Sequence, residues 1–255
     1  MKIAVAGGTG KTGRKVVEHL RGQGHDPVIL ARAHGVDLLE NTGLDAALDG
    51  AETVIDVSDF AAMNAKKARA SFGAATANLL AAAQRKGVRH HVALSIVGVD
   101  RVGTGYYQGK LHQEELVKAG PIPWTILRAT QFHEFADQVL TQVPGPVALV
   151  PRMQSQPIAV SEVVVHLCEL AVGAPQQMAP ELAGPRVESV VDMARQLVRR
   201  RGQRWLVLPL PVPGAAGKAM AHGGLLPTGP GPRGRQTYAE WLAELTPKGL
   251  TREGR

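Results

Sequence analysis

The amino-acid sequence predicts an α/β fold, a doubly wound parallel sheet with a small C-terminal lobe. Short apolar runs alternate with helical patterns through the first 130 residues, and this order indicates parallel strands covered by helices on both faces. From residue 131 onward the chain is richer in proline and its strand candidates are shorter. We therefore expect a single domain over 1–255, with a core over 1–130 and a smaller substrate lobe over 131–255.

Each expected element follows from a local pattern. Apolar runs bounded by turn residues predict six strands, over 2–7, 27–32, 35–40, 53–58, 90–98 and 124–130. A first helix is expected to carry Val16, Val17 and Leu20 on one face. Helical spacing followed by glycine predicts further helices over 75–87 and 106–120. In the smaller lobe, helical patterns cover roughly 187–201 and 237–245, and prolines keep the stretch between them extended over 205–213.

Composition and charge argue against several classes of protein. The single cysteine, Cys168, permits no intramolecular disulfide, which favours a reducing, cytoplasmic location. The net charge is +7, but the basic runs at 84–87 and 199–204 stand at helix ends, where cations are favoured. No run approaches the ~18 apolar residues of a membrane span. We expect neither a nucleic-acid nor a membrane partner, and no metal site.

A glycine-rich loop follows the first expected strand. It reads GGTGKTG (7–13) and lies between that strand and the first helix. Glycine allows the backbone to turn sharply and to approach a pyrophosphate, which the N–H groups of a helix N-terminus then bind. A P-loop would need another glycine five positions before Gly10, and the sequence has none there. We expect a dinucleotide, held by Gly7, Thr9, Gly10, Lys11, Thr12 and Gly13.

The second expected strand ends in Arg32, where NAD-binding folds carry an acidic residue for the ribose hydroxyls. A guanidinium suits the 2′-phosphate of NADP, which a carboxylate would repel. Lys11, inside the glycine loop, adds a second positive charge. These residues favour NADP(H) over NAD(H). Asp37 and Leu38 are further candidates beside the adenine, and Ser58 is a candidate near the cofactor ribose.

Two adjacent tyrosines precede a lysine in the expected helix 106–120. Positions three and four apart share a helix face, so Tyr106 and Tyr107 can each meet Lys110. A nearby ammonium favours the phenolate, which draws the tyrosine pKa from about 10 toward neutrality and suits a general acid. The spacing leaves open which tyrosine is used. Gly109 is unusual inside a helix, and a close approach by another chain segment or by the cofactor would explain it.

Together these runs resemble the short-chain dehydrogenase/reductase superfamily, and within it the atypical, NmrA-like NAD(P)H-binding branch. The resemblance is carried by GGTGKTG (7–13), LSIVG (94–98), YYQGK (106–110) and IPWTILRATQFHEF (122–135). It implies a Rossmann-like fold. The superfamily motif Tyr-x-x-x-Lys selects Tyr106 with Lys110. The resemblance further implies that Tyr106 donates a proton during hydride transfer, that Lys110 binds the nicotinamide ribose and lowers the tyrosine pKa, and that Ser95 hydrogen-bonds the reacting oxygen.

The sequence departs from the superfamily in two places. The interval from Ser95 to Tyr106 is short, at eleven positions. An active-site asparagine that is common in the superfamily has no secure counterpart, and Phe72 stands near its place.

The substrate end of the site is expected in the loop after the sixth strand. Ligands of open α/β sheets lie beyond the carboxyl ends of the strands, which puts residues 130–135 beside the nicotinamide. Gln131 and His133 are candidate polar contacts for the substrate, and Phe132 is a candidate wall.

We expect an NADPH-dependent oxidoreductase that reduces a small carbonyl, quinone or similar electron-poor molecule, with Tyr106 as the general acid. The alternative is a non-catalytic, NmrA-like sensor of the NADP(H) redox state that binds regulatory proteins. A third possibility is an epimerase or dehydratase. Such an enzyme recycles the hydride of a tightly held cofactor, so the cofactor would remain bound through purification. The expected partner is a small-molecule substrate. The sequence does not identify this substrate. It does not set the oligomeric state either, and a homodimer is one possibility.

NADPH is predicted to bind more tightly than NADH, because Arg32 and Lys11 replace the acidic residue of NAD-specific folds. Fluorescence titration with each cofactor measures the two dissociation constants. Equal affinities would contradict the role given to Arg32.

Overall fold

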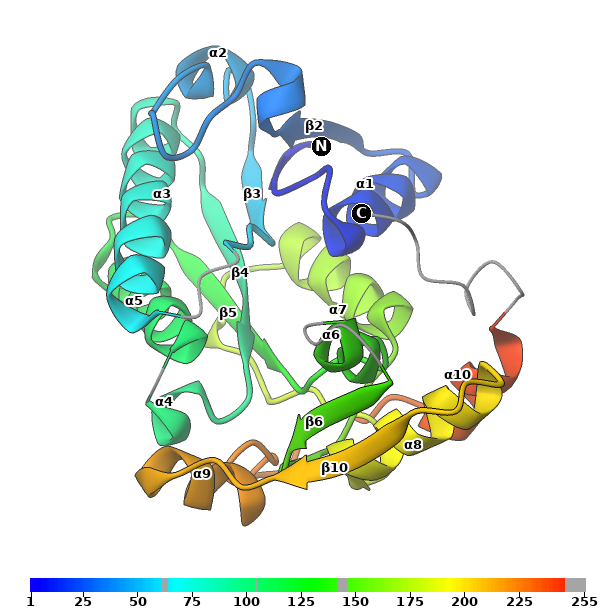
Figure 1. The fold of residues 1–255 in the computed structure, drawn as a ribbon. Helices are drawn as coiled ribbons and strands as arrows, with labels where there is room; N and C mark the ends of the chain where they lie inside the picture. The colour runs from blue at the N-terminus through cyan, green and yellow to red at the C-terminus, as the bar shows by residue number, and fades with distance from the viewer. Residues whose placement is uncertain (61–63, 104, 142–145, 246–255) are drawn as a thin grey trace. The chain divides into compact units, whose positions relative to one another are not determined.

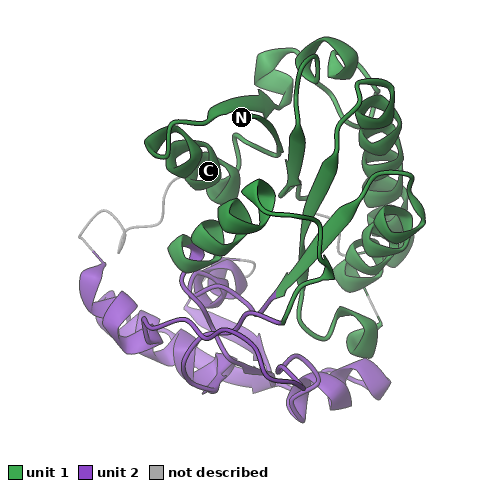
Figure 2. Ribbon diagram, turned by 180° about the vertical axis from the view of Figure 1, so that it is seen from behind, with its two compact units in different colours: residues 1–128, 161–180 green, residues 129–160, 181–255 purple. Residues whose placement is uncertain are grey.

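The computed structural model describes residues 1–60, 64–103, 105–141 and 146–245. It contains two compact units, one formed by residues 1–128 and 161–180 and the other by residues 129–160 and 181–255 (Figure 2). This division differs from the one expected at residue 131, because residues 161–180 return to the first unit. A hydrogen bond ties these residues to the sheet of the first unit, since the buried hydroxyl of Thr53 in β3 donates to the carbonyl of Ala171 at 3.2 Å.

A six-stranded parallel sheet forms the centre of the first unit, which confirms the predicted fold class. The strand order is β2-β1-β3-β4-β5-β8. The strands are β1 (Lys2–Ala6), β2 (Asp26–Leu30), β3 (Thr53–Asp56), β4 (His90–Ile96), β5 (Trp124–Ala129) and β8 (Gln177–Met178). The chain leaves β1 toward one edge and returns to β3 on the other side of β1. The carboxyl ends of β1 and β3 therefore form the topological switch point, where ligands of such sheets bind.

Helices cover both faces of this sheet (Figure 1). The helices α3 (Ala65–Arg85) and α5 (Tyr106–Ala119) lie on one face, and α1 (Lys11–Gly22) and α7 (Val160–Val172) lie on the other. Helix α5 begins at its predicted start and ends one residue before its predicted end, with Gly120 as its C-cap. Helix α3 begins ten residues before the predicted start at 75, because the side chain of Asn64 caps it by accepting the N–H groups of Lys66 and Lys67.

The predicted strand over 35–40 is wrong. The chain after β2 forms a short 3-10 helix, η1 (Arg32–His34), and then a loop in which Asp37 and Thr42 exchange backbone hydrogen bonds. The carboxylate of Asp37 accepts the N–H groups of Leu39 and Glu40, at 2.8 and 3.3 Å. A side chain that bonds its own following backbone offers an alternative to strand pairing. The short helices α2 (Leu44–Ala47) and α4 (Val99–Val102) complete the first unit.

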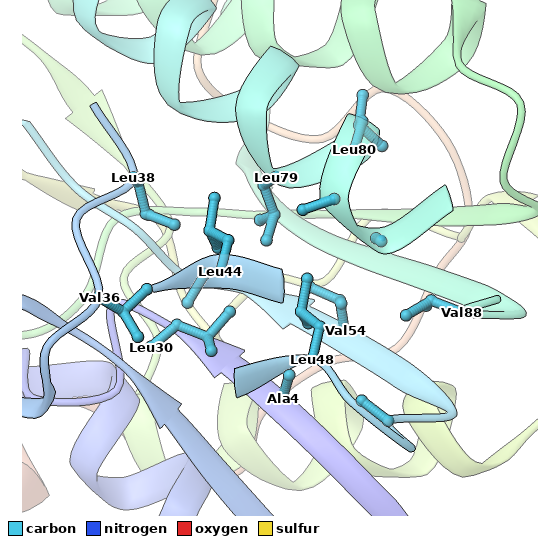
Figure 3. Packing of buried hydrophobic residues seen from close by; sticks show 14 of the residues in the cluster. Ala4, Leu30, Val36, Leu38, Leu44, Leu48, Val54, Leu79, Leu80 and Val88 are labelled. Atoms are coloured by element: carbon cyan, nitrogen blue, oxygen red, sulfur yellow. The ribbon is translucent and has the colours of Figure 1, made fainter. Parts of the chain in front are cut away.

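An apolar cluster fixes this loop against the sheet (Figure 3). Leu38 of the loop, Leu44 of α2 and Leu79 of α3 converge on Leu30 and Val54 of the strands, and all five are buried. Each such side chain contributes about 1.5–3 kcal/mol to stability when fully buried. The cluster therefore holds the region after β2, which carries Arg32, beside the end of the sheet.

The second unit is built around two small sheets. The strands β6 (Val147–Pro151) and β10 (Leu206–Leu210) pair in parallel, and β7 (Gln154–Ser155) pairs antiparallel with β9 (Glu188–Ser189). Its helices are α6 (Phe135–Thr141), α8 (Val190–Arg200), α9 (Gly214–Ala221) and α10 (Tyr238–Glu244). The predicted helices over 187–201 and 237–245 and the extended stretch over 205–213 are confirmed, with shorter bounds.

The close approach expected at Gly109 is confirmed. A β-carbon on Gly109 would lie 2.5 Å from a ring carbon of Phe72 and 2.9 Å from the backbone and side chain of Ala68. Helices α3 and α5 therefore cross at a distance that only glycine permits. This crossing places the ring of Phe72 against the residues of α5.

The substitution Gly109→Ala is predicted to destabilise the protein by about 1–3 kcal/mol, because overpacking at the crossing outweighs the helix propensity of alanine. Urea unfolding measures the free energy of unfolding. Gly22→Ala is the matched control, because Gly22 is also helical and a β-carbon there meets nothing within 4 Å. A Gly109→Ala variant as stable as this control would contradict the close crossing.

Candidate functional site

The glycine loop after β1 forms a cradle at the switch point. Gly7 has φ +77°, and a β-carbon there would lie 2.8 Å from the carbonyl oxygen of Val57. A β-carbon on Gly13 would lie 2.1 Å from the carbonyl oxygen of Gly7. Gly10 is the N-cap of α1 and provides no side-chain cap to the helix. The backbone is thus bare where a pyrophosphate would sit, and the N-terminus of α1 points its N–H groups there.

Exposed polar and charged side chains border the glycine loop and the end of β2. The N–H of Gly7 donates to the carbonyl of Leu30 at 3.2 Å, so the loop lies against the end of β2. Arg32 follows two residues later and is exposed, as are Thr9 and Lys11, while Thr12 is half-buried. The loop and its surroundings fit a dinucleotide, and the two exposed cations suit a phosphate group on it.

The candidates for the adenine end are engaged by the protein itself. Asp37 bonds its own loop, and Leu38 is only 8% exposed, with its side chain in the apolar cluster. The side chain of Asn78 on α3 donates to the carbonyls of Leu38 and Leu39, at 2.9 and 3.2 Å. The contact of Asp37 and Leu38 with an adenine stays a prediction.

A buried carboxyl group closes β3. Asp56 is fully buried, and its Oδ1 accepts the N–H of Ser58 at 2.9 Å. This bond fixes the turn that follows β3. Ser58 is itself buried and lies against Gly7, since a β-carbon on Gly7 would fall 2.9 Å from the Ser58 Cα. Ser58 therefore lies beside the glycine cradle, as its proposed contact with the cofactor requires.

Lys110 is held by a chain of hydrogen bonds that ends at Asp56. The Lys110 ammonium donates to the carbonyl of Leu94 at 2.6 Å and to Oε1 of Gln113 at 2.5 Å. Nε2 of Gln113 then donates to Oδ2 of Asp56 at 2.8 Å. Lys110 is 4% exposed, and burial lowers its pKa, although the charges of Asp56, Asp59 and Glu114 act in the opposite direction.

The Tyr106 phenol bonds to a residue that the sequence did not indicate. Its hydroxyl donates to Oδ1 of Asp59 at 2.8 Å. The ring of Tyr106 stands edge-on to Phe72, with 5.5 Å between the ring centroids, and the Lys110 Nζ lies 5.1 Å from the Phe72 centroid. Phe72 therefore contacts both Tyr106 and Lys110 with an apolar ring, near the place where the superfamily commonly has an active-site asparagine.

The pKa of Tyr106 departs from the expectation that Lys110 lowers it. Burial raises the pKa of Tyr106 well above its ordinary value, and the charge and hydrogen bond of Asp59 raise it further. The lysine nitrogen is directed to Leu94 and Gln113, whereas a carboxylate faces the phenol. A nearby negative charge disfavours the phenolate, so this phenol holds its proton at neutral pH.

Ser95 belongs to a buried ionic network. Its hydroxyl donates to Oε1 of Glu114 at 2.6 Å, and Glu114 is 1% exposed. Arg128 binds the same carboxylate through Nε and Nη2, both at 2.8 Å, and Lys118 adds a bond at 2.9 Å. A hydroxyl has one proton to donate. The role that the resemblance gives Ser95 therefore requires its bond to Glu114 to open.

The three candidate substrate contacts lie in the second unit. Gln131 accepts a hydrogen bond from the Ser155 hydroxyl at 2.8 Å, and Phe132 pairs with Ile158 in an isolated bridge. His133 is fully buried. Its ring centroid lies 5.8 Å from that of Tyr238 and 5.7 Å from that of Trp241. His133 therefore helps to attach α10, and the substrate role of all three residues stays a prediction.

Two residues of the site were missed by sequence reasoning. Gln113 stands three positions after Lys110, so the helical spacing that linked the tyrosines to Lys110 also reaches it. Asp59 follows the end of β3, where polar side chains meet the switch point of a parallel sheet. A search for polar residues just beyond each strand would have found Asp59.

No group of three His, Cys, Asp or Glu side chains among the described residues could hold a metal ion. None of the described helices is both long and apolar enough to cross a membrane.

A family model described as NAD(P)H-binding matches residues 7–169. The match includes the glycine loop, the switch point and α5. A comparison with curated proteins finds no match.

Several solved structures share the fold. An NADPH-dependent quinone oxidoreductase from Escherichia coli, in complex with NADPH, has a TM-score of 0.70 at 18% identity over 95% of this chain and 99% of that one. A nucleoside-diphosphate-sugar epimerase from Staphylococcus aureus has a TM-score of 0.69 at 14% identity over 96% and 100%. A short-chain dehydrogenase/reductase superfamily protein from Agrobacterium tumefaciens, with bound NAD, has a TM-score of 0.69 at 18% identity over 98% and 96%.

The substitution Glu114→Gln is predicted to destabilise the protein by about 3 kcal/mol at neutral pH, because it removes the buried charge that pairs with half-buried Arg128. Burial alone would raise the pKa of Glu114, but the hydrogen bonds from Arg128, Ser95 and Lys118 outweigh it and lower the pKa. A lowered carboxyl pKa gives stability that is present above the ordinary value and is lost as pH falls through the folded-state value. The difference between the two proteins should therefore shrink in acid.

Urea unfolding between neutral pH and about pH 3 measures this difference across the ordinary glutamate range. Glu115→Gln is the control, because Glu115 is adjacent and its partners Arg69 and His112 are on the surface. A difference that stays constant with pH would contradict the role of the Glu114 charge.

Proposed function

The chain belongs to the NAD(P)H-binding family, and on this premise we propose that it is an NADPH-dependent oxidoreductase. Its substrate would be a small carbonyl, a quinone or a similar electron-poor molecule, reduced by hydride transfer. One observation carries the proposal: the first unit holds a bare glycine cradle at its switch point together with Tyr106 and Lys110 on α5. The cradle suits a dinucleotide, and the two side chains suit proton transfer to a reduced oxygen.

Named residues would hold each part of the cofactor, which supplies the hydride when it is bound. The glycine loop and the N-terminus of α1 would bind the pyrophosphate. Arg32 and Lys11 would bind the 2′-phosphate and so select NADP(H). An ammonium has three N–H donors, and Leu94 and Gln113 take two of those of Lys110. The third would serve a ribose hydroxyl of the nicotinamide half.

Tyr106 would donate the proton that the reduced oxygen requires. The phenol is protonated at neutral pH, and its hydroxyl would turn from Asp59 to the substrate oxygen, because a hydroxyl has one proton to donate. Ser95 would hydrogen-bond the same oxygen after leaving Glu114. The substrate contacts of Gln131, Phe132 and His133 stay a prediction from the sequence.

The Escherichia coli neighbour is a quinone oxidoreductase, which supports placing quinones first among the substrates to test. Aldehydes and ketones follow, because the same donor groups serve any carbonyl oxygen that gains a hydride on carbon.

A second candidate function has an observation in its favour. Tyr106 is bonded to Asp59, Ser95 to Glu114, and Lys110 to Leu94 and Gln113. A site whose polar groups are satisfied by the protein suits a domain that binds NADP(H) and senses its redox state without turning over a substrate.

Tyr106→Phe is predicted to lower the rate of substrate reduction by about 10²–10⁴-fold, the usual contribution of a general acid. Cofactor affinity should be retained, because the phenol hydroxyl has no part in binding the pyrophosphate. NADPH oxidation is followed by absorbance with a panel of quinones, aldehydes and ketones, and NADPH binding is followed by fluorescence.

Tyr107→Phe is the matched control and should turn over at a rate close to that of the wild type. Comparable rates in both variants would remove Tyr106 from the mechanism. Tight NADPH binding without oxidation of NADPH by any member of the panel would favour the sensor.

A further inference from the structure

The hydrogen bond between Tyr106 and Asp59 has a consequence for the direction of proton transfer. Oδ1 of Asp59 is 2.8 Å from the Tyr106 hydroxyl, a normal distance for a phenol that donates to a carboxylate. Asp59 is exposed, whereas Tyr106 is partly buried against Phe72. The carboxyl group thus stands between the phenol and bulk water.

We propose that Asp59 is a positioning residue for the proton donor: it holds the Tyr106 phenol in its protonated form and returns a proton to it from solvent after each turnover. The inference rests on the proposed function in one respect, because Tyr106 acts as a donor only in a reductase. The coupling between the two side chains exists whether or not a substrate is turned over.

The groups around Tyr106 support this assignment. Asp59 faces the phenol from the segment after β3, Phe72 faces it from α3, and Tyr107 and Lys110 share its helix. Asp59 is the acidic group bonded to the hydroxyl. Lys110 carries the nearest positive charge among these residues, but its nitrogen is directed to Leu94 and Gln113.

The proton balance of a reduction requires a source for the proton that Tyr106 gives up. The substrate carbon gains a hydride from NADPH, and the substrate oxygen takes the proton of the Tyr106 hydroxyl. The phenolate left behind must regain a proton before the next turnover. Asp59 takes a proton from water or buffer and passes it along the existing hydrogen bond, so that each turnover consumes one hydride and one solvent proton.

The same arrangement favours reduction over oxidation. Alcohol oxidation needs Tyr106 as a phenolate base, and a carboxylate at hydrogen-bond distance opposes loss of that proton. Burial of the ring acts in the same direction. The site is therefore set as a proton donor at neutral pH.

A titration that needs no turnover tests the coupling. The chain has three tyrosines, and burial raises the pKa of Tyr238 far above its ordinary value. In a Tyr107→Phe background Tyr106 and Tyr238 remain, and the difference from a protein that also carries Tyr106→Phe assigns the phenolate absorbance of Tyr106. Ultraviolet absorbance of the phenolate is followed to about one unit above the ordinary value of about 10, while circular dichroism confirms that the protein stays folded.

In this background Tyr106 should remain protonated over that range. Adding Asp59→Asn keeps a hydrogen-bond acceptor but removes the charge, and phenolate absorbance of Tyr106 should then begin to rise within that range. Asp26→Asn is the matched control, because Asp26 is also exposed but lies at the amino end of β2, away from the switch point. An absorbance titration that Asp59→Asn leaves unchanged overturns the proposal.

The proton-return step is tested with an accepted substrate. Asp59→Ala should lower kcat without changing the KM for NADPH, and added acetate should restore part of the loss by supplying a carboxyl group. Tyr106→Phe should show no rescue. An unchanged kcat in Asp59→Ala would overturn the proposal while leaving the reductase intact, whereas a wild-type protein that binds NADPH but reduces nothing would refute the proposed function.

Discussion

A buried carboxyl group at the end of β3 is the constraint on which the site depends. Asp56 has no exposure to water, and burying such a group is costly unless hydrogen bonds satisfy it. One oxygen fixes the turn at Ser58, which borders the glycine loop, and the other binds Gln113. Gln113 in turn holds Lys110. The phosphate end and the proton-transfer end of the first unit are therefore tied to one residue.

The crossing of α3 and α5 provides the second constraint. Gly109 lets the two helices approach until Phe72 contacts both Tyr106 and the Lys110 nitrogen. An aromatic ring in this place offers no hydrogen bond to the lysine. Gln113 supplies the polar contact instead, and the ring keeps water from that side of the phenol.

Tyr106, Ser95 and Lys110 each have a hydrogen-bond partner within the protein. This condition explains how the unit remains stable with buried charges, because Glu114 and Arg128 compensate each other and Ser95 completes their network. It also means that substrate binding would have to exchange hydrogen bonds rather than fill empty ones. A reductase and a redox sensor differ in whether that exchange takes place.

The sequence by itself determined the parallel sheet, the glycine loop and α5, because these depend on local periodicity and on glycine at fixed positions, whereas the family came from the resemblance of its motifs. The sequence also singled out Tyr106, Lys110 and the anomaly at Gly109. Only the tertiary structure decided what surrounds them, since Asp59 lies 47 positions from Tyr106 along the chain and Asp56 lies 57 positions from Gln113. The strand predicted over 35–40 failed for a related reason, because Asp37 bonds its own loop and Leu38 is buried under α3. Periodicity reports which face of an element is apolar, whereas hydrogen-bond partners are set by how the elements pack.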